Sequence, residues 1–483
     1  MGNLNDIYAL GDMIELSKEL KNLIDQDMGS IEKINMRKAD SYYDNVNDIA
    51  NIDFRKYKGS CGETKINENR SNQRLSHNFL KILVNQAVSY IVGNPVNYST
   101  DDKQFQDFLD DYLMFNFDDM VVNLCKEVRK KGRGYIHVYY DSLGELDYAV
   151  IPSEQIIPIY RDGFKKELES VIRYYGVNAL DPKGKEVVAK RVEWWTENEV
   201  RYFNQNDEGG FDLDIVSPQW EYSIDTNPDL VEGLGWGKVP FVEVFNNDEG
   251  TGDLVDIKCH VDSYDLIQSE FVNQIADIRE ILIKVLGYSG SSADDILQAF
   301  RGTGIVKIDD ASGNVDVLKS EIPVEARQSA LTNLRDNIFL FGQGVDPAPD
   351  KIGTAVSGIA LKMLYGSLDL KCNISIRLLK KGLYKFIWFL AEHFNRTHGG
   401  GANYKHVKFT VNKNMIVNET EIITNLANSK GLISDSTILE NHPFVLDVEL
   451  EEERLAAQNE NDMEDFYKAI KTEEVEKEGE VQG

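Results

Sequence analysis

Apolar residues recur at steps of three and four between Asp253 and Leu286, the spacing that places side chains on one face of an α-helix. No Pro or Gly interrupts this stretch, so it predicts a single helix of about 50 Å at 1.5 Å per residue. Burying each large apolar side chain is worth roughly 1.5–3 kcal/mol, while fixing each residue's backbone costs roughly 1–2 kcal/mol. Such a helix gains little alone and needs a partner along its length. The predicted packing residues are Ile257, Val261, Tyr264, Phe271, Ile275, Ile278 and Leu282.

A second apolar stripe follows Pro323, a residue that is tolerated in the first turn of a helix. It predicts a helix that returns along the first and ends at Phe341, with Leu331, Leu334 and Ile338 as packing residues. Between the two helices, the sequence predicts a short helix capped by Ser291 or Ser292 and a hairpin of residues 305–308 and 315–318. The helical pair therefore holds a small lobe at its tip.

Residues 343–355 contain two prolines and three glycines when Gly342 is included, so the chain must form a loop there. Helix is predicted to resume near Val356 and to persist to about His398, with Gly366 and Gly382 as places for a kink. Residues 418–460 turn helical again, with Gly431 as a C-terminal cap and Ser434 as the next N-cap.

The periodicity changes from 3.6 to 2 after Lys131, which predicts a β-rich region before the long helix. Helices are predicted before it at 4–34, 75–92, 102–112 and 117–131, and its strands at 135–140, 146–151, 170–175, 191–195, 200–204 and 241–244. Residues 406–411 are predicted to return one strand to this region. The fold class is therefore α+β.

Two stretches carry a resemblance to a known family. The long helix begins Gly353-Thr354-Ala355-Val356-Ser357-Gly358-Ile359-Ala360-Leu361-Lys362, and Asn72 to Val84 continues to Tyr90-Ile91-Val92-Gly93-Asn94-Pro95-Val96, with a Gly-x-Pro ending. Together with the order of helix, tip module, helix, proline-containing loop and long helix, they resemble the portal proteins of tailed bacteriophages, of the type found in siphophages of Gram-positive hosts. The resemblance spans about residues 40–445.

The resemblance implies a portal-type ring subunit with long stem helices, a mixed α/β wing, a small α/β clip and a helical crown. Its expected parts are N-terminal helices and β-rich wing (1–252), stem helix (253–286), clip (287–321), returning stem helix (322–342), tunnel loop (343–355), long helix and return to the wing (356–417), helical crown (418–460) and acidic tail (461–483).

The resemblance also implies partners. About twelve copies would form a ring at one capsid vertex of the virion, around a channel that double-stranded DNA passes non-specifically. The clip, with Arg301 and Lys307 as candidate contacts, would dock the terminase large subunit during packaging and the head–tail connector afterwards. Scaffold and major capsid proteins would join the ring in the host cytoplasm.

The loop is expected to face this DNA through Val345, Asp346, Pro347, Ala348, Pro349, Asp350, Lys351 and Thr354. Lys351 is the only cation of residues 343–355. Beside carboxylates it would give weak, transient phosphate contacts that suit sliding, and its alternative role is a surface charge with a local partner.

Charge changes the picture further, because 81 acidic against 52 basic residues give a net charge of −29. Such acidity argues against a protein that grips nucleic acid, yet an acidic channel wall would repel a duplex from every side and hold it nowhere. The most basic run, Lys126 to Arg133, is either a nucleic-acid patch or a solvated helix end, and the helix dipole favours the second.

Catalytic chemistry is not predicted. Residues 233–238 lack the spacing and the Ser or Thr of a nucleotide-binding loop, and the seven histidines show no metal-ligand spacing. We therefore expect no enzyme, no cofactor and no metal, and a separate protein as the DNA motor. Four cysteines without paired spacing are expected as reduced thiols, and no membrane contact is expected. The alternative function is a structural or adaptor oligomer of a phage particle without an axial DNA channel, and an enzyme of unrecognised type comes third.

Overall fold

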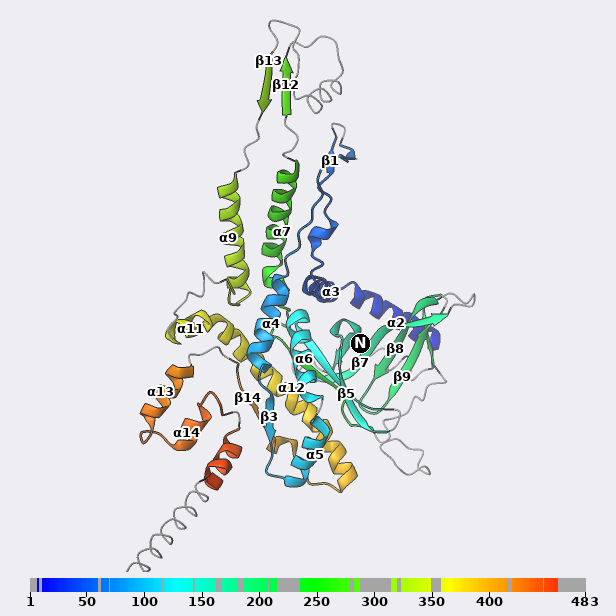
Figure 1. Ribbon diagram of the computed structural model, residues 1–483. Helices are drawn as coiled ribbons and strands as arrows, with labels where there is room; N and C mark the ends of the chain where they lie inside the picture. Colours follow the sequence, from blue (N-terminus) through cyan, green and yellow to red (C-terminus); the bar gives the residue numbers. More distant parts are fainter. Residues whose placement is uncertain are drawn as a thin grey trace, which may run out of the picture. The chain divides into compact units, whose positions relative to one another are not determined.

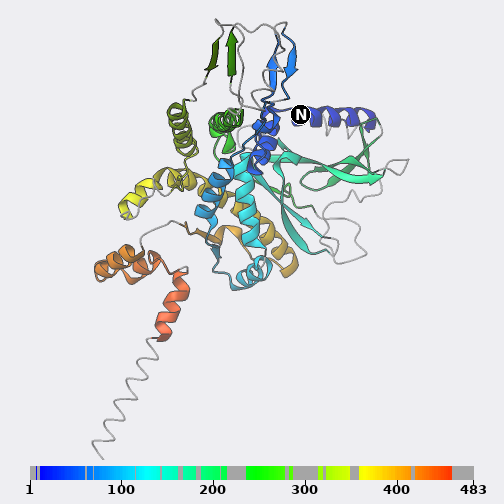
Figure 2. The ribbon, with the colours of Figure 1, turned by 45° about the horizontal axis from the view of Figure 1, so that its top comes forward.

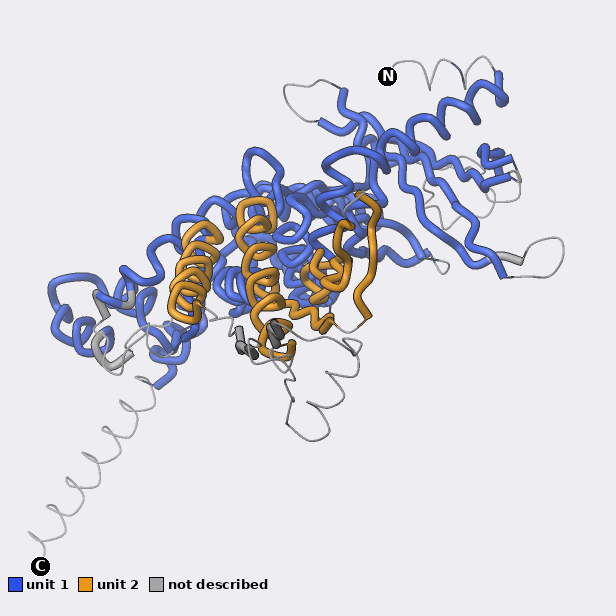
Figure 3. Tube along the Cα trace, turned by 90° about the horizontal axis from the view of Figure 1, so that it is seen from above, with its two compact units in different colours: residues 1–40, 82–253, 343–483 blue, residues 41–81, 254–342 orange. Residues whose placement is uncertain are grey.

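The computed structural model describes residues 7, 11–59, 62–68, 70–114, 116–141, 144–161, 167–180, 186–206, 208–214, 235–277, 282–286, 314–318, 323–348, 358–414, 419–445 and 447–458. The chain divides into two compact units (Figure 3). Unit 1 comprises residues 1–40, 82–253 and 343–483, and unit 2 comprises residues 41–81 and 254–342.

A five-stranded antiparallel sheet forms one part of unit 1. Its strand order is β10-β9-β8-β7-β6, and helix α2 (Met13–Met28) lies against it (Figure 1). Leu16, Leu20 and Ile24 recur every four residues on α2 and are buried against Trp194 and Phe203 of the sheet. The strands are β6 (Ile156–Tyr160), β7 (Leu168–Leu180), β8 (Glu186–Trp195), β9 (Val200–Gln205) and β10 (Phe211–Leu213).

A second, three-stranded sheet has the order β11-β4-β5, from β4 (Arg133–Tyr140), β5 (Leu146–Ile151) and β11 (Phe241–Phe245). Helix α6 (Phe117–Lys131) leads into β4 through Gly132, whose φ of +84° is the left-handed conformation that glycine adopts without strain. The long helix α12 (Gly366–His398) packs on this sheet through a stripe that includes Leu379, Leu383 and Phe386.

Shorter elements complete unit 1. Its helices include the C-terminal part of α4 (Phe79–Val92), α5 (Lys103–Leu113), α11 (Gly358–Leu364), α13 (Glu419–Ser429), α14 (Asp435–Glu440) and a helix at 448–458. Strand β3 (Val96–Ser99) pairs antiparallel with β14 (Lys408–Val411). The Ser434 hydroxyl caps α14 by accepting from the Thr437 amide, as predicted.

Unit 2 contains α7 (Leu254–Asp277) and α9 (Val324–Phe341), which lie side by side (Figures 1 and 2). Helix α3 (Ile31–Tyr43) runs from unit 1 into unit 2. The unit also contains two hairpins, β1 (Lys56–Lys58) with β2 (Thr64–Ile66) and β12 (Leu282–Leu286) with β13 (Asn314–Leu318).

The predicted outgoing helix was too long. Helix α7 ends at Asp277, so its 24 residues span about 36 Å. Residues 282–286 form a strand that pairs with residues 314–318, in the register Leu282 with Leu318. The segment contains the β-branched residues Ile283 and Val285, which favour a strand, and this pairing overrides the helical spacing. The predicted partner of 315–318, residues 305–308, lies outside the described residues, as do Ser291 and Ser292.

Two other predictions also need correction. Residues 408–411 pair with β3 instead of returning to the β-rich region. The long helix is interrupted at Tyr365, next to the expected kink at Gly366, but it continues through Gly382. The predicted strands between residues 135 and 244 and the helices at 102–112 and 117–131 are confirmed to within a few residues.

Gly382 is required by packing and not by a kink. A Cβ at this position would lie 2.4 Å from Val244 Cγ2, inside the contact between α12 and β11. We expect Gly382→Ala to lower the free energy of unfolding by about 1–2 kcal/mol, because overpacking outweighs the helix propensity that alanine gains. Gly366→Ala is the matched control, since a Cβ there meets nothing within 4 Å. Thermal unfolding measured by circular dichroism compares the two, and an equal melting temperature would contradict the packing argument.

Candidate functional site

Helices α7 and α9 bury part of the predicted apolar stripe within one chain. Ile257, Val261, Leu331 and Ile338 are at most 5% exposed, and Tyr264, Phe271 and Leu334 are partly buried. Ile275 is 51% exposed, Ile278 lies outside the described residues, and Leu282 belongs to β12 and not to the helix. The rings of Tyr264 on α7 and Phe339 on α9 each make an edge-to-face contact with Phe79.

Another face of α7 is polar and buried, which the sequence analysis missed. Residues 70–78, here called the strap, run antiparallel to α7, and α7 side chains accept hydrogen bonds from alternate backbone N–H groups of the strap. Four residues of helix rise about 6.0 Å and two residues of extended chain about 6.6 Å, so the two repeats match. The four bonds join Ser71 N to Asp277 Oδ1 (2.8 Å), Gln73 N to Asn273 Oδ1 (2.6 Å), Leu75 N to Ser269 Oγ (2.9 Å) and His77 N to Asp265 Oδ1 (3.1 Å).

Asp265 is the most heavily bonded member of this ladder. Its side chain is 1% exposed, and its Oδ1 also lies 2.7 Å from Nδ1 of His77. Its Oδ2 accepts from Asn47 Nδ2 at 2.6 Å, and the same nitrogen donates to the His77 carbonyl. His77 is therefore hydrogen-bonded, and its contacts with Asp265 fix the register of the strap on α7.

The loop after α9 is anchored in unit 1. Val345 is 4% exposed, so it lies in the core of this unit and does not face a channel, which corrects its predicted place. The Asp346 side chain accepts from the Ala348 amide at 3.0 Å, and Pro347 is exposed. Pro349, Asp350, Lys351 and Thr354 lie outside the described residues, as do Arg301 and Lys307.

Four of the five cations in the basic run, all except Lys126, are held in ion pairs, so they form neither a nucleic-acid patch nor a solvated helix end. The side chain of Lys131 is 3% exposed and lies within 2.9 Å of carboxylate oxygens of Glu127, Glu154 and Asp40. Burial disfavours its ammonium form, but Glu127 and Glu154 outweigh this cost and raise the pKa of Lys131 above its ordinary value. Arg133 pairs with Glu32 and Glu243 in the same way.

Asp253, immediately before α7, is the centre of a second buried ion cluster. Its carboxylate lies 2.9 Å from Lys371 Nζ and 3.6 Å from Arg129 Nη1, and accepts from Asn246 Nδ2 at 3.0 Å. Burial raises the pKa of this carboxyl, but Lys371 and Arg129 outweigh the effect and hold the pKa below its usual range. Asp40 and Asp253, the last residues of two segments of unit 1, are therefore both held by cations from the end of α6.

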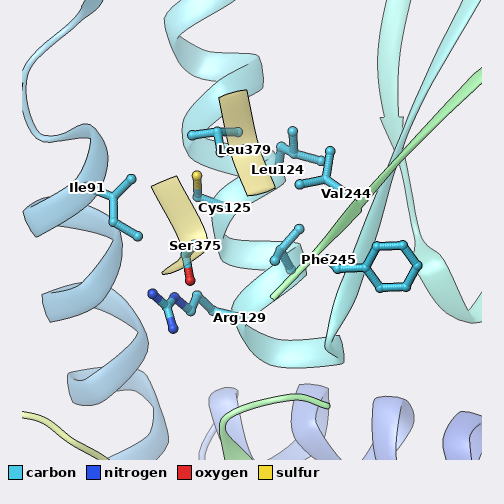
Figure 4. Close-up of a pocket in the computed structure, with 9 residues that line it drawn as sticks. Ile91, Leu124, Cys125, Arg129, Val244, Phe245, Ser375 and Leu379 are labelled. Atoms are coloured by element: carbon cyan, nitrogen blue, oxygen red, sulfur yellow. The ribbon is translucent and has the colours of Figure 1, made fainter. Parts of the chain in front are cut away.

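A cavity of about 10 Å³ lies beside Arg129, between α4, α6, α12 and β11 (Figure 4). It has room for about one water molecule, far below the roughly 300 Å³ of a small-ligand pocket. Burial raises the pKa of the Cys125 thiol to about 12 and of the nearby Cys372 thiol to about 11, so both are inert core residues. Cys259 is exposed, and Cys61 lies outside the described residues.

Within the described part of the chain, no group of three or more His, Cys, Asp or Glu residues has the arrangement of a metal site. None of the described helices has both the length and the apolar character that crossing a bilayer requires. His137, Trp194 and Trp236 are buried in the core.

Comparison with known proteins identifies the family. The model of the family described as "Phage portal protein, SPP1 Gp6-like" matches residues 26–465. The chain belongs to this phage portal protein family. The portal protein of Bacillus phage SPP1 is 31% identical over 472 residues, which cover 93% of this chain and 91% of the relative. The portal protein of Clostridium phage phiCD119 is 30% identical over 475 residues, covering 93% and 98%.

Solved structures with similarity include the neck of a native GTA particle computed with C12 symmetry, at 12% identity and a TM-score of 0.39, over 74% of this chain and 87% of that chain. The neck of an empty GTA particle, computed with C6 symmetry, has 13% identity and a TM-score of 0.41 over the same shares.

Membership of the family confirms the portal resemblance predicted from the sequence. Portal proteins are structural components of the phage particle that form oligomeric rings and associate with the capsid, so this chain is a ring-forming virion protein of mixed α/β fold.

Apolar periodicity predicts neither the hydrogen-bond ladder on α7 nor the buried ion clusters at the end of α6. Asp265, Ser269, Asn273 and Asp277 recur every four residues, and this spacing is the signal that could have revealed the ladder.

Proposed function

We propose that copies of this chain, about twelve in number, surround an axial channel through which double-stranded DNA enters the capsid during packaging and leaves during ejection. In this assignment α7 and α9 are the stem, and the part of the chain between them is the clip. The clip docks the terminase large subunit during filling and the head–tail connector afterwards. Scaffold and major capsid proteins join the ring as it forms in the host cytoplasm.

The observation that carries this proposal is the apolar surface that one copy leaves on its stem. Leu266 is 36% exposed, Ile275 51%, Leu340 63% and Phe341 49%. A neighbouring copy related by rotation can cover this surface with a different part of its own stem, which is the heterologous contact that closes a ring. Within one chain, neither α7, α9 nor the other described residues cover these four side chains.

Charge supports a channel that lets DNA slide. At −29 per copy the ring repels phosphate over most of its surface, so it offers no stable binding site for a duplex. Lys351 supplies the weak attractive contact, and the prolines at 347 and 349 stiffen the loop that carries it. We assign no catalytic step to this chain, so ATP hydrolysis belongs to the docked motor.

Electron microscopy of the purified protein tests the channel. Negative-stain images are expected to contain rings with a central hole wide enough to admit a DNA duplex. Compact oligomers without a hole would instead support the adaptor function. A stable monomer at high concentration would contradict both.

Lys351→Ala tests the loop. We expect rings to form normally, because the side chain is assigned no role in the stem, and the number of DNA-filled capsids to fall about tenfold. Lys18→Ala on the surface of α2, where the lysine side chain is 66% exposed, is the matched control and should leave filling unchanged. Particle counts by electron microscopy measure the result, and a loss of rings with Lys351→Ala would assign the segment a structural role instead.

A further inference from the structure

Gln86 on α4 holds the first residues of the loop by two hydrogen bonds to a single backbone unit. Its Nε2 donates to the Val345 carbonyl at 2.6 Å, and its Oε1 accepts from the Val345 amide at 3.1 Å. A primary amide matches a peptide unit in this way because it has a donor and an acceptor side by side. Both partners belong to unit 1, and the Val345 side chain is buried.

The backbone next to Val345 is shaped to allow this contact. Gln343 has a φ of +53°, a left-handed conformation that non-glycine residues rarely adopt. Gly344 approaches α4 so closely that a Cβ would lie 2.2 Å from Leu83 Cδ2 and 3.0 Å from Gln86 Oε1. Such strain and close approach persist only where surrounding contacts hold the chain in place. The contact therefore depends on both residues: the Gln86 amide bonds the Val345 backbone, and the absence of a side chain at Gly344 lets the backbone approach α4.

We infer that Gln86 is the positioning residue of the tunnel loop: its amide, together with the close approach of Gly344 to Leu83, fixes the point from which the loop leaves α4. This inference rests on the proposed function only for the statement that the loop touches DNA. Gln86 itself contacts neither DNA nor a motor in this assignment. It acts by setting where the chain beyond Val345 begins.

The chemistry of the contact orders the variants. Gln86→Ala removes both hydrogen bonds. Gln86→Glu keeps the acceptor for the Val345 amide but turns a carboxylate oxygen toward the Val345 carbonyl. It should therefore weaken the contact almost as much as Gln86→Ala does. Gln104→Ala on α5 is the matched control, because it makes the same substitution at an exposed position on a helix of the same unit.

The loop contains a built-in reporter. Lys351 is the only lysine or arginine between Arg335 and Lys362, so mass spectrometry distinguishes trypsin cleavage at Lys351 of assembled rings from cleavage at other sites. Losing two hydrogen bonds should raise the population of the detached loop by about tenfold or more. We expect Gln86→Ala rings to be cut at Lys351 about ten times faster than the parent, and Gln104→Ala rings at the parent rate.

Filling of capsids with DNA is the second readout. Fast cleavage with intact rings and about tenfold fewer filled capsids supports both the positioning role and the function of the loop. Fast cleavage with normal filling also supports the positioning role but contradicts the proposed contact of the loop with DNA. Cleavage at the parent rate in Gln86→Ala rings overturns the inference.

A second pair of variants keeps the test open if Gln86→Ala does not form rings. Gly344→Ala should raise the cleavage rate because the new Cβ meets Leu83, and Leu83→Ala added to it should return the rate toward that of the parent by making room. Gly344→Ala rings that are cut at the parent rate would overturn the inference as well.

Discussion

Asp253→Asn is expected to lower the free energy of unfolding by about 3–5 kcal/mol, the usual cost of breaking a buried ion pair by removing one charge. The side chains of Asp253 and Arg129 are each 2% exposed, so the guanidinium would remain buried without its carboxylate. The contact with Lys371 would be lost at the same time. Urea unfolding followed by intrinsic fluorescence measures the change.

Asp248→Asn is the matched control, because Asp248 is exposed in the turn after β11 and its replacement should change stability by less than about 0.5 kcal/mol. Arg129→Met provides a further check. If the two charges stabilise each other, the double variant Asp253→Asn with Arg129→Met will be more stable than the sum of the single effects predicts. Strictly additive effects would mean that the pair is not coupled.

The same carboxyl contributes to the dependence of stability on pH. Its pKa in the folded chain lies below the unfolded value of about 3.9, so the folded state favours the ionised form. This contribution is fully present above the unfolded pKa and is lost as the pH falls through the folded pKa. We therefore expect Asp253→Asn to flatten the acid side of the stability curve below about pH 4, measured by unfolding at a series of pH values.

The sequence predicted those elements whose local pattern and tertiary partners agree. The apolar residues of α6 follow a helical period and those of β4 a strand period, and Gly132 separates the two. Both elements were therefore predicted correctly. Residues 282–286 fit both a helical stripe and a strand, and only their pairing with residues 314–318 decides between the two. Such pairing depends on residues about thirty positions away, which local periodicity does not reveal.

The basic run of α6 illustrates the same limit for charge. In the sequence, cations clustered at the end of a helix look like a solvated surface. Four of the five are paired in the structure, but their partners Asp40, Glu154, Glu243 and Asp253 are distant in the chain. Burial of a lysine or arginine needs such partners. The sequence therefore predicted the family and the pairing of two helices, while the two ion clusters and the anchoring of Val345 became evident only from the structure.

Asp265→Ala is expected to release the strap from α7. The substitution removes the acceptor of three donors, the His77 amide, the His77 ring nitrogen and the Asn47 side-chain amide. With the His77 amide left unpaired and Asn47 Nδ2 left only its bond to the His77 carbonyl, the free energy that holds the strap should fall by about 3 kcal/mol or more. Hydrogen–deuterium exchange by mass spectrometry on the peptide covering residues 70–78 measures this directly, with about a hundredfold faster exchange expected.

Two variants control this result. Glu270→Ala removes an exposed carboxylate from the same helix and should leave exchange in the strap unchanged. Ser269→Ala removes one rung, the bond to the Leu75 amide, and should have a smaller effect that is confined to the middle of the strap. If Asp265→Ala leaves exchange of the strap at the parent rate, the ladder does not hold it, and the apolar contacts of Phe79 with Tyr264 and Phe339 must fix this segment instead. Helix α7 therefore has two faces with different roles. The apolar face packs against neighbouring helices, and the polar face binds the backbone of the strap, whose register is set at Asp265.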